Sequence, residues 1–234
     1  MTNSNSTQIS FVKEQNKFLA RTYGWMTLAL IISGLTSFGT AAYISSVGIQ
    51  NFYSFFQIGF PVLAIAEIIL VAWLSASISK ISAAGASVAF IVYSVLNGLT
   101  LSSIFIVYNL SSLVTIFLTS AGMFAAMAIY GTFTKQNILS FGRYFSMALI
   151  GLVIATIVNL FVKSGTFDWI LSIVTVVLFT GLSAYDAQKM TRVSEHAENT
   201  EVFKKASIIG ALELYLDFIN IFLSMLRLFG KRRD

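Results

Sequence analysis

Residues 208–228 read IIGALELYLDFINIFLSMLRL. An apolar helix of about 20 residues crosses the hydrocarbon core of a bilayer, and this stretch has the required length. It also carries two acids, Glu213 and Asp217, in surroundings where an ionised carboxylate costs about 3 kcal/mol or more. Such an acid persists in a spanning helix when it has a partner or a function. The stretch therefore predicts a membrane fold and points to a functional site.

The composition of the whole chain agrees with a membrane protein. Of its 234 residues 56% are hydrophobic and only 11% are charged, whereas about 25% of residues are charged in a soluble domain. There is no cysteine, which excludes disulfides, thiol catalysis and cysteine metal sites. The net charge of +5 does not indicate a nucleic-acid binder, because the basic residues lie at the ends of apolar runs.

Seven apolar runs have the length of a spanning helix. We predict an all-α membrane protein with transmembrane helices at 25–45, 56–77, 85–107, 113–133, 145–162, 169–187 and 207–229. The connections are mostly short, so sequential helices should pack antiparallel. The expected organisation is a polar cytoplasmic N-terminus at 1–22, one transmembrane domain at 23–230 and a basic tail at 231–234. The N-terminus lacks the pattern of a signal peptide, so we expect the first run to be retained.

Charge predicts the orientation of these spans. Basic residues precede the first run and occupy every second connection, while the connections 46–55 and 108–112 carry no charge. Because cytoplasmic loops are enriched in lysine and arginine, the N-terminus is predicted in the cytoplasm. One feature disagrees, since seven spans would place the basic residues of 231–233 outside. Either the tail violates the rule or the last segment does not fully cross, and we favour seven spans.

The last predicted helix has one polar face. Small or polar residues recur at spacings of three and four, at Ala206, Gly210, Glu213, Asp217, Asn220 and Ser224. This spacing is one side of a helix, which should point at protein or water in a membrane. Tight helix packing explains the small residues. It does not explain two acids one turn apart, which repel each other if both are ionised.

The sixth predicted helix has a weaker polar face and a second buried aspartate. Ser183 and Asp186 lie on this face, and Phe179 interrupts it as a possible constriction. We expect the two polar faces to meet each other or a shared cavity. Lys189, one turn from Asp186, offers that aspartate an ion-pair partner. Glu67 in the second helix is a further membrane-embedded acid, which either lines the same cavity or takes a hydrogen bond near the outer interface.

Several motifs resemble one known family. They are GLSAYDAQK at 181–189, GALELYLDFINIFL at 210–223, YGWM at 23–26, GLTLSSIF at 98–105 and LRLFG at 226–230. These motifs closely resemble the signatures of the Bax inhibitor-1 family, also called the transmembrane Bax inhibitor motif family. The resemblance covers nearly the whole chain. The short polar N-terminus resembles that of bacterial inner-membrane members.

The resemblance implies a fold in which helix 7 is central and the other six surround it. It also implies a pH-sensitive calcium leak that is gated by a proton-sharing pair, Asp186 and Asp217, which would also bind calcium weakly and transiently. We expect no enzymatic activity and no cofactor, with lipid and calcium or protons as partners. The pore-lining candidates are Glu213, Asn220, Glu67, Ser183 and Phe179. Some bacterial relatives place a latch arginine late in helix 2, whereas this chain has only Lys80 nearby, a poorer bidentate partner.

Other functions have some support in the sequence. Aspartates on helices 6 and 7 also suit a presenilin-type intramembrane protease, but that class has a Gly-x-Gly-Asp motif and here LYL precedes Asp217. A serine or zinc protease is disfavoured, because the single histidine, His196, lies in the polar connection 191–205, which we expect to be a solvated loop. A non-transporting regulator remains the alternative. It would bind and modulate a membrane protease or other membrane protein, with the connection 191–205 as its contact.

The depth of the two aspartates poses a geometric question. Asp186 lies near the cytoplasmic end of its predicted helix. Asp217 lies ten residues beyond Ser207, or about 15 Å at the rise of an α-helix. Either helix 7 begins below the membrane surface, or the two aspartates do not touch.

Overall fold

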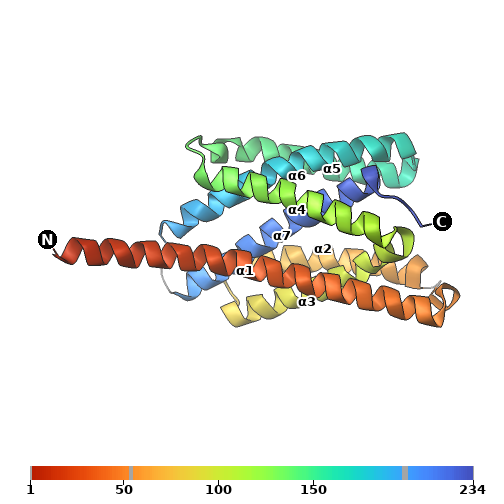
Figure 1. Ribbon diagram of the computed structural model, residues 1–234, viewed down its shortest axis with the longest axis horizontal. Coiled ribbons are helices and arrows are strands. Elements are labelled where there is room, and N and C mark those ends of the chain that lie inside the picture. Colours follow the sequence, from red (N-terminus) through yellow and green to blue (C-terminus); the bar gives the residue numbers. More distant parts are fainter. Residues whose placement is uncertain (1, 53–54, 197–199, 234) are drawn as a thin grey trace. The chain divides into compact units, whose positions relative to one another are not determined.

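The computed structural model describes residues 2–52, 55–196 and 200–233, and this part of the chain is almost entirely helical. The seven long helices (Figure 1) are α1 Thr2–Val47, α2 Phe60–Ser77, α3 Ala83–Val107, α4 Leu110–Phe133, α5 Gly142–Val162, α6 Gly165–Ser194 and α7 Glu201–Phe229. Three short elements are a 3₁₀ turn at Ile49–Phe52, a π-helical turn at Phe55–Gly59 and a 3₁₀ turn at Ile138–Phe141. The predicted all-α class is confirmed. Residues 1 and 234, the outer bounds of the predicted N-terminus and tail, lie outside the described residues.

Seven helices of the described chain are long and apolar enough to cross a membrane. Their outward side chains are large and apolar, with Phe161 at 82% exposure and Phe133 at 78%. Water would penalise such continuous apolar surface, whereas lipid solvates it. The protein is therefore an integral membrane protein with seven predicted spans confirmed as helices.

The chain forms two compact units. The first unit holds the described residues of 2–109, 200–212 and 232–233, and the second unit holds 110–196 and 213–231. Helix α7 contributes to both, because the division falls between Leu212 and Glu213. The central position of α7 stays a prediction, although α7 has the largest buried share of the seven, 67% of its most apolar stretch.

In the first unit, α1 packs closely on α3. Gly98 makes this approach possible, since a Cβ atom there would lie 2.7 Å from the carbonyl oxygen of Ser33. The Ser33 hydroxyl donates a hydrogen bond of 2.7 Å to the Ser94 carbonyl. The start of α7 joins the same unit, because the Glu201 carboxylate accepts a hydrogen bond of 2.6 Å from the amide of Ala83. That bond satisfies one of the amides left free at the start of α3.

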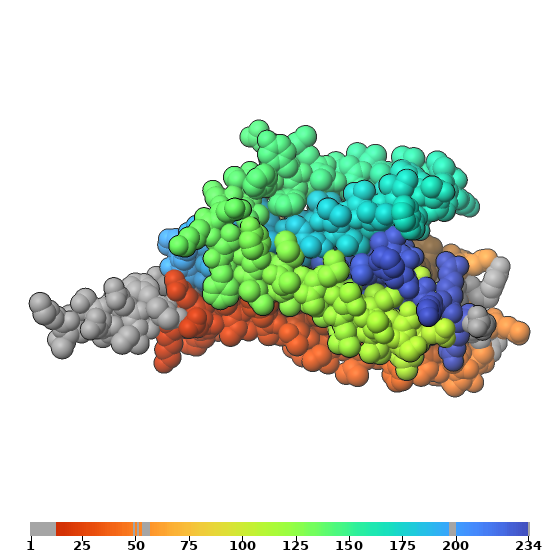
Figure 2. All heavy atoms as spheres, turned by 45° about the horizontal axis from the view of Figure 1, so that its top comes forward, coloured from red at the N-terminus to blue at the C-terminus, as the bar shows by residue number. Residues whose placement is uncertain are grey.

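In the second unit, α6 lies between α4 and α5 (Figure 2). The contact with α4 is closest at Gly131, where a Cβ atom would lie 2.1 Å from the carbonyl oxygen of Ala184. The Tyr185 ring packs edge-on against Phe145 of α5, with ring centres 5.6 Å apart. Both contacts involve the two residues just before Asp186, so they fix the part of α6 that carries this aspartate.

Helix α5 has the least buried surface of the second unit. Leu152 is its one buried residue, and Phe161 and Leu160 are among its most exposed side chains. This helix therefore contacts α6 along a narrow line and presents the rest of its surface outward.

The structure corrects one prediction. The connection 191–205 was predicted as a loop, and this is wrong for most of its described residues, because α6 continues to Ser194 and α7 begins at Glu201. The ion pair between Arg192 and Glu195, three residues apart at 3.2 Å, is of the kind that supports a helix in water. The segment predicted as the polar N-terminus is helical from Thr2 and continuous with the first span, and its cytoplasmic location stays a prediction.

We predict that Gly131→Ala lowers the free energy of unfolding of the purified protein by about 1 to 3 kcal/mol, the usual cost of overpacking a tight contact. The melting temperature should fall accordingly. Gly122→Ala on the same helix is the matched control, because a Cβ atom there meets nothing within 4 Å. The control should be neutral or slightly stabilising, since alanine favours helix over glycine by about 1 kcal/mol. Equal melting temperatures of the two variants in detergent would refute this close contact.

Candidate functional site

The site lies where α6 faces α7 in the second unit. The side chains of Asp186 on α6 and Asp217 on α7 are hydrogen-bonded to each other. Both are buried, with exposures of 8% and 3%. The sequence left open whether these aspartates touch, and the structure brings them together.

A second contact between the same helices lies one turn away. The Lys189 ammonium on α6 contacts both carboxylate oxygens of Glu213 on α7, at 2.7 and 2.8 Å. Lys189 follows Asp186 by three residues and Glu213 precedes Asp217 by four, so the helices run antiparallel through both contacts. This ion pair is half-buried, with side-chain exposures of 38% for the lysine and 30% for the glutamate.

The contact between the two aspartates answers one part of the question of depth. Of the two alternatives, the one in which Asp186 and Asp217 do not touch is wrong. The level at which α7 begins relative to the membrane surface stays a prediction.

The contact between two carboxyl groups has a chemical requirement. A carboxylate only accepts hydrogen bonds, so a hydrogen bond between the two aspartates requires a proton on one of them. The second oxygen of Asp217, Oδ2, is buried and has no hydrogen-bond partner among the described residues. The pair thus brings two buried carboxyl groups and an unsatisfied acceptor together, in an environment where unpaired polar atoms are costly.

Lys189 is the residue whose role the sequence reasoning missed. It was considered as a partner for Asp186, and the structure pairs it with Glu213 instead. The signal was present, because Lys189 and Asp186 lie on one face of α6 while Glu213 and Asp217 lie on one face of α7. The site is therefore a buried aspartate pair with a half-buried ion pair beside it.

The other candidates on α6 and α7 bond within their own helices. The Ser183 hydroxyl donates to the Phe179 carbonyl at 2.8 Å, and the Asn220 amide donates to the Leu216 carbonyl at 2.8 Å. Ser183 and Phe179 are buried, and Asn220 is half-buried. Their pore-lining role and the constriction at Phe179 stay predictions.

Glu67 belongs to the first unit, where its partners are on α3. Its carboxylate accepts a hydrogen bond of 2.9 Å from the Asn97 amide and a second one from the Thr100 hydroxyl. Of the two sequence interpretations, hydrogen bonding is the one that the structure displays. Glu67 joins α2 to α3, and a pore-lining role for it stays a prediction.

The predicted latch cation and the predicted calcium ligands differ in where the structure places them. Lys80 lies exposed in the turn after α2, and the cation that contacts an acid at the site is Lys189. Among the described residues, no group of three or more histidine, cysteine, aspartate or glutamate side chains is arranged to hold a metal ion. The weak calcium binding predicted for Asp186 and Asp217 stays a prediction.

Fold and site together define a class: an α-helical membrane protein with seven spans and a buried carboxyl pair between its last two helices. The sequence profile of the family described as "Inhibitor of apoptosis-promoting Bax1" matches residues 15–234. The chain belongs to this family, the Bax inhibitor-1 family.

Individual relatives match over almost their full length. The inner membrane protein YbhL of Escherichia coli K12 is 44% identical over 218 residues, which cover 92% of each chain. A protein of Borreliella burgdorferi is 38% identical over 94% of each chain, and one of Deinococcus radiodurans is 38% identical over 97% of this chain and 96% of its own. The chain is thus similar to bacterial members along its whole length.

We predict that Lys189 and Glu213 stabilise the packing of α6 on α7 as a pair. Lys189→Gln and Glu213→Gln should each lower the free energy of unfolding, because each leaves an uncompensated charge in the helix interface. The double variant should recover part of this loss. We expect a coupling free energy of about 1 kcal/mol, at the upper end for a partly exposed pair. Additive losses in thermal or denaturant unfolding would mean that the two side chains do not interact.

Proposed function

We propose that the protein is a pH-sensitive calcium or cation leak channel of the bacterial inner membrane, gated by Asp186 and Asp217. The observation that best supports this proposal is the direct hydrogen bond between two buried carboxyl groups on neighbouring helices. The inner-membrane location is proposed from the name of the Escherichia coli relative. We also propose that the protein is not an enzyme and needs no cofactor.

The closed state is the one with a shared proton. One proton on the pair makes the hydrogen bond between α6 and α7 possible and lowers the charge that is buried there. The Lys189–Glu213 ion pair lies one turn away and links the same two helices. At low pH both contacts act together to keep the helices in contact.

Loss of the proton would open the contact. Two carboxylates about 4 Å apart repel by about 4 kcal/mol at the effective dielectric of a partly buried site. This exceeds the roughly 1 kcal/mol expected from an ion pair that is partly exposed. The repulsion between the two carboxylates should therefore exceed the attraction in the Lys189–Glu213 ion pair. As the pH rises, α6 and α7 should separate at this point.

The open site would attract calcium without retaining it. With the proton gone, three carboxylates and one ammonium leave a net charge of −2, which one Ca²⁺ ion neutralises. Calcium prefers six to eight oxygen ligands. Asp186, Asp217, Glu213 and Asn220 offer fewer than that, so water must complete the shell. Weak, hydrated binding suits passage through a channel, because an ion must leave the site as readily as it enters.

We predict that Asp217→Asn abolishes the pH dependence of calcium flux. Asparagine donates a hydrogen bond to Asp186 at every pH and so imitates the protonated pair, which should hold flux near its low-pH level. Purified full-length protein in liposomes with an entrapped calcium dye gives the measurement. Asp168→Asn is the matched control, because Asp168 is a half-exposed aspartate on α6, outside the pair, and lies 3.7 Å from Arg227. If Asp217→Asn keeps the flux and pH response of the unchanged protein, the gate proposed here is wrong.

Reconstitution of the unchanged protein separates a channel from a regulator. We expect calcium permeability from the purified protein alone, larger at pH 8 than at pH 6 because the pair loses its proton. Protein-free liposomes and liposomes with Asp217→Asn serve as controls. Absence of flux from correctly folded protein at both pH values would reject the channel and favour a non-transporting regulator of another membrane protein.

A further inference from the structure

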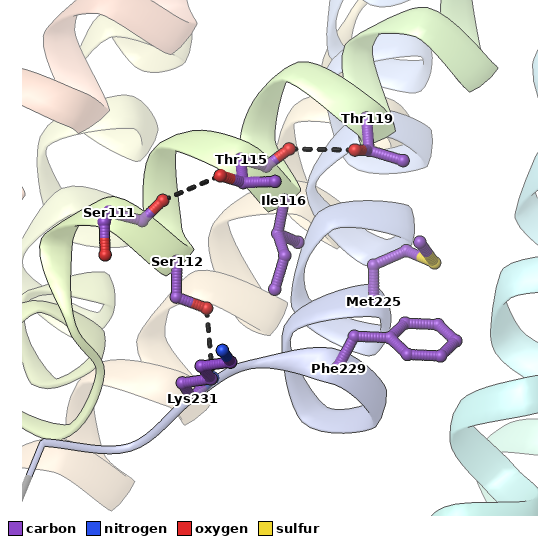
Figure 3. Close-up of a pocket in the computed structure, with 8 residues that line it drawn as sticks. All are labelled: Ser111, Ser112, Thr115, Ile116, Thr119, Met225, Phe229 and Lys231. Atoms are coloured by element: carbon purple, nitrogen blue, oxygen red, sulfur yellow. Dashed lines mark hydrogen bonds between the residues drawn. The ribbon is translucent and has the colours of Figure 1, made fainter.

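A second feature of the molecule lies at the opposite end of the second unit from the Lys189–Glu213 pair. A pocket of about 510 Å³ opens between the first turns of α4 and the last turns of α7. Figure 3 shows the eight side chains that line it: Ser111, Ser112, Thr115, Ile116, Thr119, Met225, Phe229 and Lys231. None of these residues takes part in the carboxyl gate. All belong to the second unit.

The end of the pocket nearest the chain terminus is polar. The backbone amide of Lys231 donates a hydrogen bond of 3.0 Å to the Ser112 hydroxyl, which fixes the tail against the start of α4. In the described part of the chain, the Lys231 ammonium forms no ion pair. Ser112 accepts in its bond, so its own hydroxyl proton stays available. An ammonium and the neighbouring hydroxyls of Ser111 and Ser112 are donors suited to a phosphate group.

The rest of the pocket is suited to hydrocarbon. Ile116, Met225 and Phe229 form its apolar wall. Thr115 and Thr119 also line it, but each hydroxyl donates to the backbone carbonyl four residues earlier, at 2.9 Å. Both hydroxyl protons are already engaged in these hydrogen bonds, so the two threonines need no hydrogen-bond acceptor on a ligand. The pocket thus has donors for a phosphate group at one end and a mostly apolar wall, suited to an acyl chain, at the other.

We propose that this pocket binds an anionic phospholipid, with its phosphate at Lys231, Ser111 and Ser112 and one acyl chain along Ile116, Met225 and Phe229. A free phosphate ion would use the polar end alone and leave the apolar wall uncovered. Lys231, which lines this end of the pocket, supplies the positive charge that favours an anionic lipid over a zwitterionic one. Each basic residue near an anionic lipid surface contributes about 1 kcal/mol.

The proposal also accounts for an anomaly of the sequence. With seven spans and a cytoplasmic N-terminus, the basic tail lies on the side where the positive-inside rule does not expect it. Binding of lipid phosphate gives these charges a role on that side. The site is independent of the proposed gate, so it stands or fails separately from channel activity.

The test is native mass spectrometry of the delipidated full-length protein with phosphatidylglycerol or phosphatidylcholine. We expect preferential retention of one phosphatidylglycerol molecule. Lys231→Gln should weaken that retention about fivefold, the factor that corresponds to one basic residue. Lys163→Gln is the matched control, because it removes an exposed lysine after α5 that does not line the pocket. The control should bind like the unchanged protein.

A second pair of variants tests the acyl-chain wall. Thr115→Trp should fill the pocket and abolish lipid retention, whereas Leu118→Trp, on α4 but outside the pocket, should not. Equal retention of both lipids without an effect of Lys231→Gln would overturn the proposal. Inorganic phosphate that binds in place of the lipid, with full insensitivity to Thr115→Trp, would also overturn it in favour of a simple anion site. If Thr115→Trp does not fold, Lys231→Gln decides, because it changes only an exposed side chain.

Discussion

A carboxyl group inside a membrane must have a partner, and this constraint governs the second unit of the protein. Asp186 and Asp217 are buried, and each lies within hydrogen-bonding reach of the other. Glu213 is compensated by the ammonium of Lys189 instead. The same pair of helices thus pairs two carboxyl groups with each other at the buried layer, and a carboxylate with a cation at the half-buried layer.

The helical fold and the polar face of α7 could be predicted from the sequence, because apolar run length and three-to-four spacing are local properties. The pairing of Asp186 with Asp217 was expected from the family resemblance, but the partners of the two glutamates were not predicted. The lysine that pairs with Glu213 lies on another helix, and residue spacing within α7 does not show which helix faces it. Glu67 is similar, since Asn97 and Thr100 come from α3. The loop predicted at 191–205 failed for a different reason: polar composition marks the end of a membrane span, and α6 continues as a helix beyond that end.

The position of Asp186 depends on residues that carry no charge. Gly131 admits the backbone of α6 at Ala184, and the ring of Phe145 packs against Tyr185, so two neighbouring helices hold the residues just before the aspartate. Gln188 adds a polar tie, donating to the Gln136 carbonyl at 2.8 Å and accepting from the Leu139 amide at 3.2 Å. In this arrangement α6 is held firmly on its α4 and α5 sides. A movement that separates the aspartates is therefore expected from α7 rather than from α6.

Helix α5, unlike α6, is held by few contacts with neighbouring helices. With Leu152 as its one buried residue, almost every side chain of this helix meets lipid rather than protein. Exchange of one apolar residue for another should be nearly neutral there, so α5 can drift in evolution while its hydropathy is preserved. The bilayer, and not the neighbouring helices, selects its sequence. Chimaeras that exchange α5 between relatives would then keep the site intact, and the ancestry of this helix would be the hardest in the chain to trace.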